Sequence, residues 1–202
     1  MKIRGWIQQF QPMKHYVIAA TLVFVLGLIL GYTDSGAFDK LIHAQIKQMQ
    51  GIADQIKQSN HQQWELFSRI LMNNLLASIM AILFGLFLGL VPLYFLVSNG
   101  LMLGYVAANR DKGETMFHLL LGVLPHGILE IPAFILACAV GIRLGFIMLE
   151  SFGSLFNLER RERYQLKLRT FIRLLIPMVA LIAVLMLLAA IIESTVTYAL
   201  MK

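Results

Sequence analysis

Long apolar runs without charge constrain this chain more than any other feature of its sequence. Residues 16–32, 70–109 and 174–192 contain no charged side chain, and 115–141 contains one carboxylate and two histidines. A helix of about 20 apolar residues crosses the hydrocarbon of a bilayer. Since lipid offers no hydrogen bonds, each run must satisfy its own backbone groups as a helix. The sequence therefore predicts an all-α, polytopic transmembrane helix bundle.

The number of spans follows from the distribution of positive charge. We expect two spans in 70–109, separated at a turn or kink near Pro92. Five spans then place the N-terminus and the basic segment 149–170 in the cytoplasm, and the nearly neutral segments 33–69 and 109–114 outside. The positive charges concerned are Lys2, Arg4 and Lys14 at the N-terminus and Arg160, Arg161, Arg163, Lys167 and Arg169 in the basic segment. A single span in 70–109 would put these arginines outside, against the positive-inside rule.

We expect one membrane domain, 1–202, with no separate soluble domain. Its parts are a first span at 16–32, an extracytoplasmic segment at 33–69, and the remaining spans and motifs in 70–202, with the fourth apolar run at about 115–148 and the last span at about 171–192. No small-x-small cleavage site follows Leu30, so we interpret the first span as uncleaved. The basic segment 149–170 is expected to lie along the inner leaflet.

The extracytoplasmic segment has the pattern of an amphipathic helix. Apolar residues recur at three- and four-residue spacing, at Phe38, Ile42, Ile46, Met49, Ala53 and Ile56, while Lys40, Lys47, Gln48, Asp54 and Lys57 occupy the other faces. Ser35 is a suitable N-cap. Packing against the other spans is the favoured role, and contact with lipid or with a partner protein remains open.

Small residues form rows at every fourth position. The rows are Ala77, Ala81, Gly85 and Gly89; Ala133, Ala137, Gly141 and Gly145; Gly27 and Gly31; and Gly100 and Gly104. Residues four apart share a helix face, and small side chains let helix backbones approach closely in lipid. The rows predict a compact bundle, and some of them could instead serve a homodimer.

The ionisable residues at membrane depth are the candidate functional site. His126 and Glu130 stand four apart after Pro125, with Gly127 between them, and Pro132 lacks the donor that a continuous helix would use. Polar groups at this depth are costly and usually functional. Three interpretations compete: structural hydrogen bonding, half of a metal site, and a proton relay or substrate contact.

A metal such as zinc would need a further ligand, which His118 or Glu193 could supply. The second histidine of the H-E-x-x-H pattern is absent, and no G-x-S-x-G motif or phosphate-binding glycine loop occurs, so the residues do not support an enzyme. Asn73 and Asn99 are further polar positions, expected to form interhelical hydrogen bonds or to pair with Glu130.

Other classes of partner and chemistry are disfavoured. The net charge of +6 fits cytoplasmic segments facing anionic membrane lipids. No aromatic residues cluster among the basic ones to stack on bases, so nucleic acid is not an expected partner. The single cysteine, Cys138, lies in an apolar run and excludes an intrachain disulfide. Arg143 is expected to extend its charge toward the inner surface.

At these residues the chain resembles the stage II sporulation protein M family. The resemblance rests on the stretch Ser-Asn-Gly-Leu-Met-Leu-Gly at 98–104, on Leu-Pro-His-Gly-Ile-Leu-Glu-Ile-Pro-Ala at 124–133, and on Gly-Ile-Arg-Leu-Gly at 141–145. It covers roughly 65–200. It carries over a set of motif positions without assigning them chemistry: Asn99, Gly100, Gly104, Pro125, His126, Gly127, Glu130 and Pro132.

The resemblance implies five spans in the bacterial cytoplasmic membrane and a role as a scaffold of peptidoglycan remodelling. In spore-formers it implies forespore engulfment, with the stage II sporulation proteins D and P, which degrade peptidoglycan, as partners. The alternative is a metal- or proton-dependent membrane enzyme or transporter centred on His126 and Glu130.

Overall fold

The computed structural model describes most of the chain and consists of helices throughout the described part. The described residues are 11–33, 36–38, 40, 42–44, 47, 51, 62–108, 127–154 and 158–200. The elements are η1 (Gln11–Met13), α2 (Lys14–Thr33), η2 (Gly36–Phe38), α4 (Gln62–Leu83), η3 (Phe84–Leu86), α5 (Leu90–Ala108), α7 (Glu130–Ser154) and α8 (Leu158–Leu200). Among the described residues, five helices are long and apolar enough to cross a membrane. This confirms the polytopic helical bundle and its five spans.

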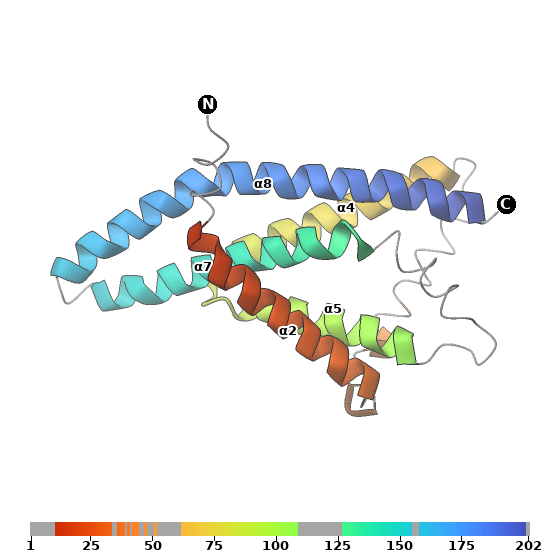
Figure 1. The fold of residues 1–202 in the computed structure, drawn as a ribbon, viewed down its shortest axis with the longest axis horizontal. Coiled ribbons are helices and arrows are strands. Elements are labelled where there is room, and N and C mark those ends of the chain that lie inside the picture. Colours follow the sequence, from red (N-terminus) through yellow and green to blue (C-terminus); the bar gives the residue numbers. More distant parts are fainter. Residues whose placement is uncertain are drawn as a thin grey trace.

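Helix α7 is the centre of the bundle. It contacts each of the other four long helices, with α4 and α8 on one side and α2 and α5 on the other (Figure 1). In its most apolar stretch 67% of the residues are buried, against 22–33% in the other four spans. The outer helices expose large aliphatic side chains, among them Leu22 and Ile176. A membrane supplies the apolar surroundings that these side chains require.

The chain reverses between α4 and α5 without any charged or strongly polar residue. The reversal occurs at 87–89, where Leu88 and Gly89 have φ angles of 55° and 77°. Four backbone hydrogen bonds satisfy the turn, including Phe87 N–H to Phe84 O and Gly89 N–H to Gly85 O. A turn whose polar groups are bonded internally can remain at membrane depth. Pro92 is not the turn itself, because it lies in the first helical turn of α5, where a missing N–H costs little.

The predicted boundaries of two spans differ from the observed ones. Helix α4 begins at Gln62, inside the segment that was expected to be extracytoplasmic, and its first turns carry an ion pair between Glu65 and Arg69. Helix α7 begins at Glu130, after a turn at Ile128 and Leu129, and Pro132 lies in its first turn. The segment 109–126 lies outside the described residues. It includes most of the part of the predicted fourth run that precedes α7.

The basic segment predicted at 149–170 comprises the end of one helix and the start of the next. Helix α7 continues to Ser154 and α8 begins at Leu158, so the two form a helical hairpin instead of a loop on the inner leaflet. The hairpin extends beyond the α4–α5 turn, at the left in Figure 1. An ion pair between Lys167 and Glu150 joins its two arms.

Helix α8 changes direction within its length (Figure 1) and contains Pro177. Proline cannot bond the carbonyl four residues earlier, which is the usual cause of such a bend. The bend lets α8 pack on α4 in one half and on the inner end of α7 in the other.

Candidate functional site

The motif glycines pack helix backbones against each other. Gly27 and Gly31 of α2 meet α5, and Gly100 and Gly104 of α5 meet α2. A Cβ atom on Gly104 would lie 2.8 Å from the backbone N of Tyr32, and one on Gly27 would lie 2.7 Å from Val97 O. The two glycine pairs therefore face each other within one chain.

The other two rows of small residues make a similar contact between backbones. A Cβ atom on Gly85 would collide with the backbone of Gly141, and one on Gly145 would lie 2.7 Å from the Cα of Gly89. Gly141 in turn abuts the carbonyl of Ala81. The structure thus gives Gly100, Gly104, Gly141 and Gly145 a packing role inside the bundle.

Glu130 is the residue of the predicted His-Glu pair that the structure describes. It begins α7 and is partly buried. It lies about 18 Å along the helix from Ile142, which packs at the α4–α5 turn. Gly127 is also partly buried, and Ile128 and Leu129 form a turn before α7. The helix is therefore interrupted at 128–129, whereas the placement of His126 relative to Glu130 lies outside the described residues.

The remaining predicted ligands are only partly described. Pro125, His126 and His118 lie outside the described residues, and Glu193 is buried near the end of α8, with 5% of its surface exposed. Within the described ranges, no three His, Cys, Asp or Glu side chains are grouped so as to hold a metal ion. A site that includes the two histidines stays a prediction.

Within the described part of the chain, Asn73 and Asn99 form no interhelical hydrogen bond of the kind that was expected. Asn99 is exposed, and its side-chain amide donates to Phe95 O in its own helix at 2.9 Å. Asn73 is also exposed and donates to Asn74 Oδ1 at 3.4 Å. The buried polar residues of α4 are Asn74 and Ser78, which the sequence reasoning missed.

The pitch of the helix explains why Asn74 is buried and Asn73 is not. Residues four apart are offset by about 40° around the axis, so a row extended by two steps rotates by about 80°. The row that runs back from Gly89 through Ala81 therefore rotates off the buried face before it reaches Asn73. Asn74 is the buried residue at that level instead. A period of 3.6 residues, applied instead of 4, would have found it.

Arg143 is buried instead of extending to the surface. Only 6% of its surface is exposed, and its guanidinium lies 5.6 Å from the ring centroid of Phe171 on α8. Tyr16 of α2 packs nearby on α7, with its ring 5.8 Å from the ring of Phe146 between centroids. The C-terminal half of α7 thus holds a buried cation that packs against α8.

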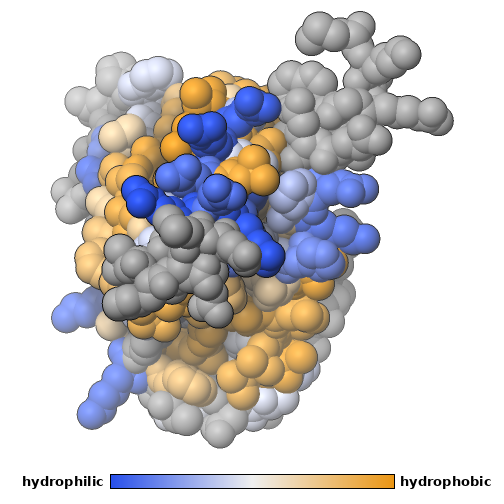
Figure 2. Space-filling view, turned by 90° about the vertical axis from the view of Figure 1, so that its left-hand side faces the viewer, coloured by the Kyte–Doolittle hydropathy of each residue, from blue (hydrophilic) through white to orange (hydrophobic). Residues whose placement is uncertain are grey.

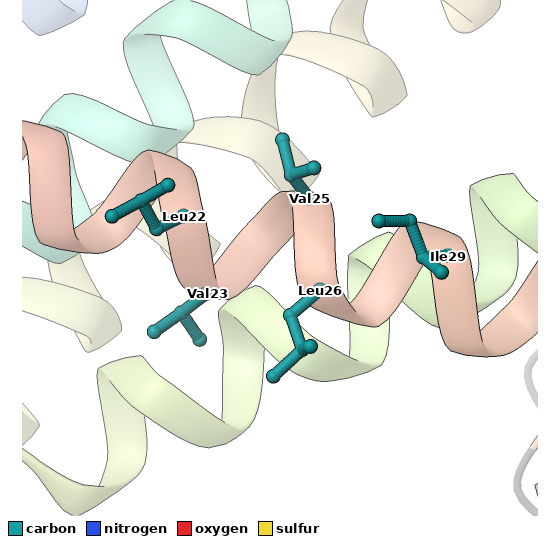
Figure 3. A pocket seen from close by; sticks show the side chains of 5 residues that line it. All are labelled: Leu22, Val23, Val25, Leu26 and Ile29. Atoms are coloured by element: carbon teal, nitrogen blue, oxygen red, sulfur yellow. The ribbon is translucent and has the colours of Figure 1, made fainter.

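A groove on α2 offers no chemistry. It is lined by Leu22, Val23, Val25, Leu26 and Ile29, all aliphatic and all from one helix (Figure 3). Such a surface suits the acyl chains of lipid. We therefore do not place a site there.

The described residues of the extracytoplasmic segment agree with its predicted amphipathic pattern. Ile42 is fully buried, whereas Lys40, His43 and Lys47 are exposed. The His43 ring lies 6.2 Å from the ring of Tyr105 near the end of α5. This part of the segment packs on the outer end of the bundle, while Ser35 and most of 45–61 lie outside the described residues.

These features define a polytopic α-helical membrane protein whose interior is closed by glycine contacts between backbones. The chain belongs to the Stage II sporulation protein M family, which matches residues 20–198. An uncharacterized protein of Methanocaldococcus jannaschii is 28% identical over 194 residues, covering 94% of this chain and 84% of that protein. No solved structure matches the chain.

Proposed function

We propose that this protein is a membrane scaffold that recruits peptidoglycan-degrading enzymes to the bacterial cytoplasmic membrane. In a spore-former the recruited enzymes are the stage II sporulation proteins D and P, and the process is forespore engulfment. The match to the Stage II sporulation protein M family over 20–198 is the observation that carries the proposal.

The packing of the bundle supports a scaffolding role. Glycine contacts fix α2 on α5 and α4 on α7, where the backbones leave no room for a methyl group. Such interfaces hold helices in one arrangement because small residues permit close backbone approach. A rigid bundle can present an attached segment in a constant position.

The exposed face of the extracytoplasmic segment is the proposed contact surface. Ile42 is buried and the His43 ring contacts Tyr105, so this part of the segment is fixed to the bundle. Lys40 and Lys47 remain exposed on the side away from Ile42. Two fixed lysines favour a partner with an acidic surface, since complementary charge steers and selects partners.

Reversing both charges tests this surface without uncovering the bundle. Lys40→Glu together with Lys47→Glu should reduce the recovery of co-purifying peptidoglycan hydrolases about tenfold, which corresponds to ~1.4 kcal/mol. The measurement is affinity purification from native membranes in a mild detergent, with quantitative mass spectrometry.

The matched control is Lys40→Arg with Lys47→Arg, which keeps the charge and should recover the hydrolases at the wild-type level. Equal amounts of each variant in the membrane fraction show that insertion is unchanged. Undiminished hydrolase recovery by the glutamate variant would refute the contact surface, and a wild-type preparation without hydrolases would refute the scaffold.

A further inference from the structure

Arg143 occupies a three-helix junction at the inner end of the bundle. Helices α2 and α8 both pack on α7. The Arg143 guanidinium of α7 lies over the ring of Phe171 of α8, and Tyr16 of α2 contacts Phe146, which is three residues further along α7. Figure 1 shows the start of α2 beside the bend of α8, over the inner half of α7. The junction is level with the α4–α5 turn, because Gly145 of the same helix abuts Gly89.

One donor atom of the Arg143 guanidinium is buried without a hydrogen-bond acceptor among the described residues. Its Nη1 atom is fully buried and forms no hydrogen bond within the described part of the chain. The ring of Phe171 stabilises the positive charge through its π face but accepts no conventional hydrogen bond. A guanidinium carries five N–H donors, and a buried charge is expensive unless it is paired and hydrogen-bonded.

Basic residues stand close in sequence to the residues that contact this part of α7. Glu150, about two turns further along α7, forms an ion pair with Lys167. Lys14 and Arg173 are exposed near the junction in sequence. Seen end-on, this end of the molecule shows a hydrophilic patch bordered by hydrophobic surface (Figure 2). A hydrophilic surface beside hydrophobic surface suits a lipid, which has a polar headgroup and apolar acyl chains.

We propose that Arg143 binds the phosphate of an anionic phospholipid from the inner leaflet. Two phosphate oxygens match the fork of donors at the edge of a guanidinium. Basic pockets between spans on the cytoplasmic side bind such headgroups. Phe146, half exposed beside Tyr16, provides an apolar surface for an acyl chain. This site is independent of the scaffold function.

Thermal unfolding of the full-length protein in an uncharged maltoside detergent tests the site. After delipidation, phosphatidylglycerol should raise Tm by about 5 °C. Digalactosyldiacylglycerol, which has the same acyl chains but no phosphate, should leave Tm nearly unchanged. Inorganic phosphate at millimolar concentration distinguishes a free ion: a rise equal to that with phosphatidylglycerol would overturn the lipid assignment.

Variants at two arginines locate the effect. Arg143→Gln should abolish the phosphatidylglycerol-specific rise, whereas Arg173→Gln, which removes an exposed arginine of α8, should keep most of it. If Arg143→Gln does not fold, Arg143→Lys retains the charge but loses the bidentate fork, and should retain less phosphatidylglycerol in native mass spectrometry than the wild type does. An undiminished response or retention in the foldable Arg143 variant would overturn the proposal, as would a wild type that responds equally to both lipids.

Discussion

Single glycines decide how closely the helices of this protein approach. At Gly104 a Cβ atom would meet the backbone of Leu28 and Tyr32, and backbone atoms in a packed helix cannot move aside as a flexible side chain can. Gly51 is the opposite case, since a Cβ atom there would have no neighbour within 4 Å. An added methyl group should therefore be tolerated at Gly51 but not at Gly104.

Gly104→Ala should lower the free energy of unfolding by about 1–3 kcal/mol, because the added methyl group forces α2 and α5 apart. Gly51→Ala is the matched control and should change it by less than about 0.5 kcal/mol. Detergent-induced unfolding in mixed micelles, followed by circular dichroism, measures both. Equal stability of the two variants would show that the glycine contact does not hold α2 on α5.

At the scale of elements, the α4–α5 turn stores strain in a residue that is not glycine. Leu88 has a φ of 55°, a region in which a Cβ atom is unfavourable, and its side chain is 42% exposed. The adjacent Gly89 adopts a positive φ without this cost. The turn is nevertheless apolar throughout.

Leu88→Gly should therefore stabilise the protein by about 1 kcal/mol, because relief of the left-handed conformation outweighs the loss of a partly exposed side chain. Leu90→Gly, at the start of α5, is the control and should be neutral or destabilising by up to about 1 kcal/mol. The same unfolding assay applies. A loss of stability in Leu88→Gly as large as that in Leu90→Gly would contradict the strain argument.

At the scale of the whole molecule, charge sets the orientation. The α7–α8 hairpin carries exposed Arg161, Arg163, Lys167 and Arg169, whereas the opposite end carries the segment with Lys40 and Lys47 and the Glu65–Arg69 ion pair. The excess of arginine on the hairpin predicts that it is cytoplasmic.

Cysteine labelling can test this orientation, because Cys138 is the only cysteine and is buried. In a Cys138→Ala background, Gly51→Cys should react with a membrane-impermeant maleimide on intact cells. Glu162→Cys should react only after permeabilisation. The reverse pattern would invert the topology and would also place Arg143 near the outer leaflet.

The sequence by itself determined the membrane class, the number of spans and the expected orientation. Uncharged runs and clustered arginines are properties of contiguous residues, and the bilayer selects on them directly, so no knowledge of helix neighbours is needed. The glycine rows likewise predicted close packing of helices, because the spacing of residues along one helix defines a face.

Only the tertiary structure decided which faces meet. Gly27 and Gly31 pair with α5, and Gly85 with α7, through contacts between residues far apart in the sequence. Asn74 is buried in place of Asn73, and Arg143 is enclosed rather than extended, because helix rotation and the neighbouring Phe171 determine burial. Spacing along a chain specifies a helix face, but the partner of that face depends on how all five spans pack together.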